Sequence, residues 1–349
     1  KRQRLGRRIN VKNSGEVFEK DGFWLYGYND RNEIATASRF VGDDLKDQTQ
    51  LSPDSERVYR FDPIGNRIHA VEGKDEIQYQ TNGLNQYKRI SGPSQKEEAL
   101  SYDEDGNLIE DSRFRYSWNA ENRLVAVEPK VAEAGAMRLE FVYDYKGSRI
   151  RKEVFTFVNG GYIPSTEIGF TYDGWNMVKE SKTEYQASVE KYFVWGLDLS
   201  QLLQGAGGVG GLLAVSDGSF RYSYMFDANG NVRQLIDTDT GIVSAHYDYD
   251  PFGKILRSDS QVDFDEVYQF SSKYLDKEYR LSYYGYRYYH HDLGRWIKKD
   301  PIGEIGGKNL YGFVKNAVMT YADRWGLVLI AVDGTDSRKW AEQFNSGRW

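Results

Sequence analysis

One recurring unit constrains the fold of this chain more than any other feature. An alternating run that carries aromatic residues ends in Asp or Asn, passes through Gly or Asn, and opens a second alternating run. The clearest instances are residues 28–34, 61–68, 102–109, 118–124, 143–150, 226–232 and 249–255. Asp and Asn side chains can accept hydrogen bonds from their own turn, and Gly and Asn tolerate positive φ. Each unit therefore predicts a β-hairpin with its aromatic residues on one face.

Composition supports a β-rich chain and excludes several classes of function. The 27 Tyr, 8 Trp, 17 Phe and 35 Gly favour strands and turns. Lys and Arg number 46 against 52 Asp and Glu, a net charge of −6, whereas nucleic-acid binders normally present a basic face. There is no apolar run of the roughly 18–20 residues that a membrane-spanning helix needs.

The sequence contains few residues of the types that bind metals or form thiolate sites. There is no cysteine and there are only four histidines, so no disulfide or thiolate site can form and we expect neither a metal nor a cofactor. The first eight residues are basic, with no apolar stretch of a signal peptide behind them. Because they read as the middle of a strand unit, we expect the chain to be a piece of a longer one.

The repeats resemble the YD repeats of the bacterial Rhs family, which also occur in the C component of insecticidal toxin complexes. The resemblance is sharpest from about Tyr192 to Leu327. It is carried there by residues 195–198, 204–213, 284–289, 294–296, 300–303, 306–311 and 323–327. It implies an all-β fold in which a YD-repeat sheet is spiralled into a hollow shell, or cocoon. It also implies that a toxic C-terminal segment is cut free and held inside.

Three parts are predicted along the chain. Residues 1–190 form the YD-repeat β-shell, residues 191–327 the Rhs core with a self-cleavage motif, and residues 328–349 the start of the released segment. The last part differs in pattern, because residues 328–332 are continuously apolar, as in a buried parallel strand, and residues 337–344 favour a helix. We therefore expect a short α/β-like C-terminal segment.

The tetrapeptide Asp300-Pro301-Ile302-Gly303 carries the expected chemistry. By composition it is a type I turn, and an identical copy at residues 62–65 shows that the motif alone indicates no more than that. Only the later copy has flanks that match the Rhs core. The family pattern pairs it with a second motif about nineteen residues on, and residues 304–322 separate Gly303 from Asp323. The resemblance thus implies Asp300 and Asp323 as the catalytic pair and Leu327–Val328 as the scissile bond.

Two carboxylates in a partly buried site share a proton, as in aspartic-protease dyads. The ionised carboxylate can activate water while the protonated one donates to the scissile carbonyl oxygen, and sequence does not decide which is which. Arg295 is a candidate to hold one carboxylate bidentately, with a surface ion pair as an equal alternative. Arg324 replaces the usual Pro of the second motif, so we expect cleavage to persist but more slowly.

The predicted function is that of a polymorphic-toxin shell with single-turnover aspartyl endopeptidase activity. The resemblance implies delivery out of a bacterial cell into a neighbouring or host cell, as in bacterial competition through type VI secretion. The expected partners are its own C-terminal segment, the delivery machinery and further shell domains. Residues 329–335 also look like the start of an α/β-hydrolase-type lipase, with an ordinary strand-to-helix turn as the alternative. For the whole chain the alternative is a non-enzymatic extracellular adhesin or carbohydrate-binding repeat protein.

Overall fold

The fold is almost entirely β. The computed structural model describes residues 10–13, 22–52, 54–93, 95–262, 264–327 and 329–331. Within these residues helical structure is limited to three short 3₁₀ turns, η1 (Phe270–Ser272), η2 (Gly303–Ile305) and η3 (Val314–Asn316). The all-β prediction is confirmed.

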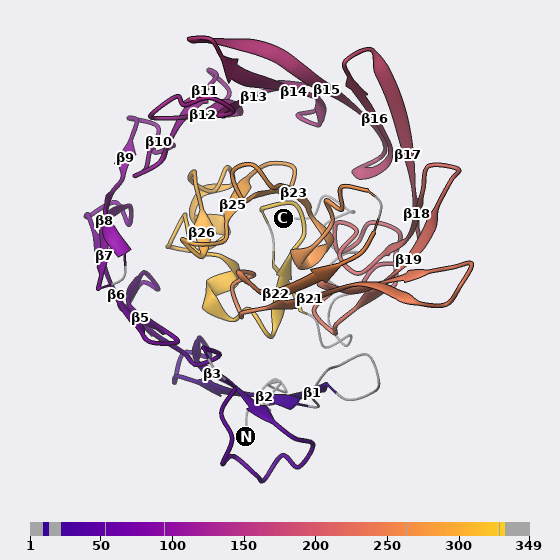
Figure 1. Ribbon diagram of the computed structural model, residues 1–349. Coiled ribbons are helices and arrows are strands. Elements are labelled where there is room, and N and C mark those ends of the chain that lie inside the picture. Colours follow the sequence, from indigo (N-terminus) through magenta and orange to yellow (C-terminus); the bar gives the residue numbers. More distant parts are fainter. Residues whose placement is uncertain are drawn as a thin grey trace.

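Consecutive strands build a long curved wall. Each strand pairs antiparallel with its neighbours in sequence, first in an eight-stranded sheet and then in a fourteen-stranded sheet. Leu100, which lies between the last strand of the first sheet and the first strand of the second, donates its N–H to the Lys88 carbonyl of the first sheet at 3.1 Å. In Figure 1 the strands follow one another around an arc, from indigo to orange, that encloses the later part of the chain.

The first sheet consists of β1 (Asn10–Asn13), β2 (Gly22–Tyr28), β3 (Ile34–Val41), β4 (Arg57–Phe61), β5 (Arg67–Glu72), β6 (Asp75–Thr81), β7 (Tyr87–Gly92) and β8 (Gln95–Ala99). The second consists of β9 (Ser101–Tyr102), β10 (Leu108–Glu110), β11 (Phe114–Trp118), β12 (Leu124–Pro129), β13 (Met137–Tyr143), β14 (Arg149–Val158), β15 (Gly161–Asp173), β16 (Asn176–Glu184), β17 (Ala187–Trp195), β18 (Leu212–Ser216), β19 (Arg221–Phe226), β20 (Val232–Asp237), β21 (Val243–Tyr249) and β22 (Ile255–Ser260).

The recurring turns form as the sequence predicts. In the turn that starts at Asp62, the Asp62 carbonyl accepts the Gly65 N–H at 3.1 Å, and Asp62 Oδ1 accepts the Asn66 N–H at 2.8 Å. Gly65 has φ +92°, a conformation in which a Cβ is strained. The turns that start at Asp103, Asp144, Asp227 and Asp250 repeat both hydrogen bonds.

The wall is apolar on its inner face. In β19, for example, Tyr222 and Tyr224 are buried on the inner face, whereas Met225, which follows Tyr224 on the opposite face, is 40% exposed. Such inward residues from successive strands join a single hydrophobic cluster with residues of the enclosed segment. The predicted inner layer of aromatic residues is confirmed.

The enclosed segment, which we call the core, comprises the described residues 266–331. It contains the sheet β23 (Tyr274–Asp276), β24 (Leu281–Tyr283), β25 (Tyr288–His290), β26 (Arg295–Trp296) and the hairpin β27 (Tyr321–Asp323), β28 (Leu329–Ala331). It lies inside the arc in Figure 1. The space that the wall surrounds is therefore occupied here by the chain's own residues.

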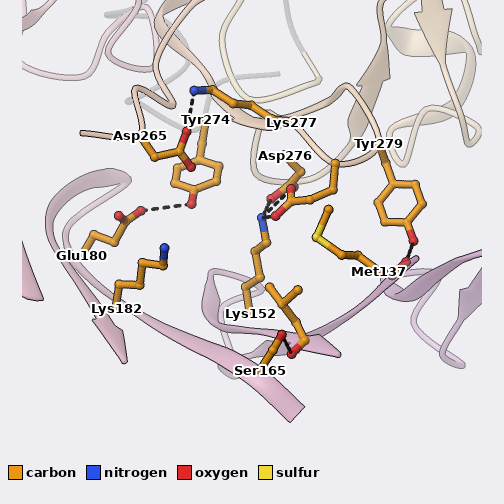
Figure 2. Close-up of polar contacts among 12 residues, drawn as sticks. Met137, Lys152, Ser165, Glu180, Lys182, Asp265, Tyr274, Asp276, Lys277 and Tyr279 are labelled. Atoms are coloured by element: carbon orange, nitrogen blue, oxygen red, sulfur yellow. Dashed lines mark hydrogen bonds and ion pairs between the residues drawn. The ribbon is translucent and has the colours of Figure 1, made fainter. Parts of the chain in front are cut away.

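Buried ion pairs join the wall to the core. Figure 2 shows Lys152 on β14 reaching Asp276 in the core, at 3.0 Å, and Tyr274 donating to Glu180 on β16, also at 3.0 Å. Arg149 Nη1 lies 2.5 Å from the same Asp276, and both side chains are 1% exposed. Charges this deeply buried are tolerated only because they are paired.

The core also binds the turns at one edge of the wall. In six turns the residue with positive φ presents its carbonyl to one core side chain. The pairs are Gly65 with Asn316 at 2.8 Å, Asn85 with Arg295 at 2.7 Å, Gly106 with Tyr311 at 2.8 Å, Asn122 with Lys298 at 2.7 Å, Gly147 with Tyr283 at 3.2 Å and Gly230 with Ser272 at 2.6 Å. We call these contacts the rim bonds.

Several sequence-based expectations change in detail. The predicted boundary between residues 190 and 191 falls inside β17, and the wall continues to Ser260 before the chain turns inward. The apolar run after Leu327 was expected to be a parallel strand, yet β28 pairs antiparallel with β27. A strand buried on both faces is apolar whether it pairs parallel or antiparallel.

The predicted helix at residues 337–344 lies outside the described residues. Among those described, no helix is long and apolar enough to cross a membrane.

Candidate functional site

Asp300 and Asp323 come from different elements of the core. Asp300 begins the predicted turn after β26, in which its carbonyl accepts the Gly303 N–H at 3.0 Å and Oδ1 accepts the Ile302 N–H at 3.1 Å. Asp323 is the last residue of β27 and lies opposite Leu329 of β28. The predicted scissile bond falls between Asp323 and Leu329 in the sequence.

Arg287 brings the two carboxylates together. Its Nη2 lies 2.9 Å from Asp300 Oδ2 and 3.5 Å from Asp323 Oδ2. The side chains of Arg287, Asp300 and Asp323 are 3%, 8% and 2% exposed. The spacing of the two motifs thus produces the expected pair of carboxylates, while their catalytic role stays a prediction.

The prediction that Arg295 holds one of the two carboxylates is wrong, because the structure places this side chain elsewhere. Its Nη2 donates to the Asn85 carbonyl at 2.7 Å, and its guanidinium lies 3.9 Å from the centre of the Tyr87 ring. At 3% exposure it is no surface ion pair either. Arg295 holds a turn of the wall, and the place at the carboxylates belongs to Arg287, eight residues earlier.

Burial shifts the acidity of both carboxyl groups. Desolvation raises the pKa of Asp323 to about 6, against the lowering effects of Arg287 and of the Leu327 N–H; the nearby Asp300 adds to the rise. Desolvation also raises the pKa of Asp300, which Arg287 opposes from a shorter distance. Burial thus favours the protonated form of each carboxyl group, and Arg287 favours the ionised form of both.

The hairpin loop is fixed directly on this pair. Asp323 Oδ1 accepts the Leu327 N–H at 2.9 Å, and Arg287 Nε donates to the Gly326 carbonyl. Lys273 Nζ donates to the Arg324 carbonyl at 3.1 Å, and burial lowers the pKa of Lys273 to about 8. The bond that precedes Leu327 is held on both sides; Val328 lies outside the described residues.

A cavity of about 460 Å³ opens beside the carboxylates. Arg287, Asp300, Asp323 and Leu327 line it, and its other wall comes from the first hairpins of the shell. A void of this size admits water and a peptide segment. The arrangement of two buried carboxylates, an arginine and a tethered peptide suits acid–base hydrolysis of that peptide.

The duplicate turn at residues 62–65 shows why the same tetrapeptide can have different roles. Asp62 Oδ2 accepts a hydrogen bond from Asn66 Nδ2 at 2.8 Å, so its carboxylate serves its own turn. Asp300 is followed at the equivalent position by Glu304, and its Oδ2 faces Arg287 instead. The residue after the tetrapeptide is a sequence signal that separates the two copies.

Arg287 was not identified as a site residue from sequence. It stands in the aromatic run 284–289, which the alternation predicts as rings on a sheet face. An arginine within a buried aromatic run needs a carboxylate or carbonyl partner, and that is the signal that could have found it. In the structure it also lies 4.3 Å over the Trp296 ring.

Comparison with known proteins supports a YD-repeat shell. Residues 198–314 match the family model described as Teneurin YD-shell. The tRNA3(Ser)-specific nuclease WapA of Bacillus spizizenii is 28% identical over 257 residues, which are 72% of this chain and 10% of that protein. Double-stranded DNA deaminase toxin A of Burkholderia cenocepacia is 26% identical over 327 residues, 86% of this chain and 22% of that protein.

The crystal structure of TcdB2–TccC3 shares the fold. It superimposes with a TM-score of 0.50 at 18% identity, covering 88% of this chain and 19% of that one. These findings confirm the resemblance to YD-repeat proteins and the shell-type all-β fold. The chain spans only about a tenth of the first of these two relatives and about a fifth of the second.

Proposed function

We propose that this chain is part of a toxin shell that encloses its own C-terminal segment and cuts that segment free after Leu327. The observation that carries the proposal is the convergence of Asp300 and Asp323 on Arg287, beside a loop anchored to Asp323 through the Leu327 N–H. The YD-shell match and the toxin among the relatives support the shell part. Delivery out of a bacterial cell, together with further shell domains and delivery machinery, belongs to the same proposal.

We infer the roles of the two carboxyl groups from their surroundings. Asp323 is the more buried and the further from Arg287, so it holds the shared proton and acts as the acid. Asp300, with the shorter contact to Arg287, is the ionised base. Asp300 takes a proton from water as the water oxygen bonds to the Leu327 carbonyl carbon. Asp323 gives its proton to the carbonyl oxygen.

The intermediate then collapses and the proton balance closes. The carbon–nitrogen bond to Val328 breaks, Asp300 passes its proton to the leaving nitrogen, and the hydroxyl proton returns to Asp323. Arg287 holds the Gly326 carbonyl next to the reacting bond and keeps both carboxylates in place. Because the substrate is part of the chain, its effective concentration is high and the reaction occurs once.

Strand pairing retains the new terminus after the cut. β28 begins at Leu329 and pairs with β27 through Asp323–Leu329, Ala322–Ile330 and Tyr321–Ala331. Ile330 is 3% exposed and Ala331 7% exposed, so the start of the released segment is packed inside the arc. A broken peptide bond is thus compatible with a segment that stays enclosed.

The chain supplies its own matched control for the test. Asp300→Asn and Asp323→Asn keep the side-chain shape but prevent proton exchange, whereas Asp62→Asn makes the same change in the duplicate turn. Denaturing gels and intact mass should show uncut chain for the first two variants, and cut chain for Asp62→Asn and the parent. Equal cutting in Asp300→Asn and the parent refutes the dyad. A parent chain that stays whole favours the non-enzymatic repeat protein.

A further inference from the structure

The shell contributes to the site through Asn316. Asn316 is 5% exposed, and its Nδ2 donates both to the Gly65 carbonyl at 2.8 Å and to Glu33 Oε1 at 3.1 Å. Gly65 belongs to the turn between β4 and β5, and Glu33 directly precedes β3. One amide therefore ties two hairpins at the beginning of the chain to a segment near its end.

That segment has an unusual backbone. Val314, Lys315 and Asn316 have φ of +41°, +54° and +57°, three consecutive residues in the left-handed region. A β-branched residue such as Val314 rarely adopts this conformation, and it persists only where surrounding contacts enforce it. The bonds from Asn316 to Gly65 and Glu33 are contacts of that kind.

The enforced segment leads without a break to the catalytic strand. The Ala317 N–H donates to the Val314 carbonyl at 3.0 Å, and the Tyr321 N–H donates to the Ala317 carbonyl at 3.1 Å. Tyr321 is the first residue of β27, which ends at Asp323. The direction in which β27 leaves the 3₁₀ turn therefore depends on the conformation at Asn316.

The same hairpins also complete the cavity. Glu33, Ile64, Gly65 and Asn316 line it together with Asp323. Of the six rim bonds, the one between Asn316 and Gly65 is thus the bond that borders the reacting groups. The bond between Tyr283 and Gly147 has the same chemistry but does not border this cavity.

We propose that Asn316 is a positioning residue for self-cleavage, which makes cutting depend on docking of the first shell hairpins onto the core. This inference rests on the proposed function. Before Glu33 and Gly65 engage Asn316, the left-handed segment is not enforced and Asp323 is not held against Arg287. The shell therefore closes first and the chain is cut afterwards, so no effector segment is freed from an open shell.

The test uses the full-length chain, refolded from denaturant, with the first-order rate of cutting measured at each variant's own optimum pH. Asn316→Asp keeps the shape and the tolerance of positive φ, but it sets an acceptor against Gly65 and Glu33. We expect cutting to slow by on the order of tenfold to a hundredfold, the range for small misplacements of reacting groups. Tyr283→Phe, the matched control, should cut at close to the parent rate.

A second substitution tests the contact itself. In Glu33→Gln/Asn316→Asp, the new amide at residue 33 donates to the new carboxylate at residue 316. This restores that contact in reverse and leaves net charge as in the parent, while the carboxylate still faces the Gly65 carbonyl. We expect the double variant to cut faster than Asn316→Asp but more slowly than the parent. If Asn316→Asp does not fold, Asn316→Gly, which keeps the positive φ without an amide, takes its place.

Three results would overturn the inference: Asn316→Asp cutting at the parent rate, no rescue by Glu33→Gln, or an equal loss in Tyr283→Phe. The last would mean that any rim bond acts through stability alone. Asp300→Asn is measured beside them. If it stays uncut while the Asn316 variants cut normally, only the positioning role fails; if it cuts, the proposed dyad fails.

Discussion

Self-cleavage should slow steeply as the pH rises through about 6. The proposed acid, Asp323, must hold a proton, and burial raises the pKa of this residue to about 6. A group whose pKa is 6 is protonated in roughly one molecule in a hundred at pH 8, so cutting at pH 8 should be about 100-fold slower than at pH 5. The rate should fall again in more acidic buffer, where Asp300 takes up a proton.

A refolding assay measures this profile. Uncut chain recovered in denaturant is diluted into buffers from pH 4.5 to 8.5, samples are quenched over time, and the fraction cut is read from denaturing gels. Tryptophan fluorescence followed in parallel separates the folding rate from the cutting rate. Asp62→Asn should give the parent profile.

Lys273 provides an independent check on the assignment. Its positive charge lowers the pKa of Asp323, so Lys273→Met should move the falling limb of the profile to higher pH. A cutting rate that stays level or rises between pH 6 and pH 8 would refute Asp323 as the proton donor. So would an acid-ward shift of the profile in Lys273→Met.

Two further predictions concern buried charges. Arg287→Met should slow cutting by about 100-fold or more at every pH, because it removes the donor that holds both carboxylates and the Gly326 carbonyl. A rate within threefold of the parent in the same refolding assay would exclude that role. Asp276→Asn should lower the free energy of unfolding by about 3–5 kcal/mol, because it removes the charge that pairs Arg149 and Lys152 in the interior. Urea denaturation of uncut chains checks this value, and a loss below about 1 kcal/mol would contradict it.

The wall could be predicted from sequence because the residues that determine each turn and each buried face lie close together in the sequence. Each turn carries its own acceptor, such as Asp103, and its own residue with positive φ, such as Gly106. Alternation then decides which face is buried. The pairing of Asp300 with Asp323 could be predicted as well, but only through the resemblance to the Rhs core, in which two such motifs are paired about nineteen residues apart.

The arginine at the site could not be predicted in the same way. Arg287 directly precedes β25 and Arg295 is the first residue of β26 in the same small sheet, and no local pattern separates them. Their roles depend on packing between distant segments: the Tyr286 N–H bonds the Trp325 carbonyl at 3.1 Å, which brings residue 287 to the hairpin, while Arg295 meets Asn85 on the wall. The rim bonds were missed for the same reason, since they join residues far apart in sequence.

The most direct test of the account is the mass of the protein after uncut chain, recovered in denaturant, is refolded in water enriched in ¹⁸O. Hydrolysis by an activated water predicts two fragments that stay associated under native conditions, one ending at Leu327 and the other beginning at Val328. The new carboxyl group at Leu327 should carry one ¹⁸O atom from solvent. A single intact chain, a break at another bond, or a Leu327 terminus without solvent oxygen would contradict self-cleavage by the Asp300–Asp323 pair.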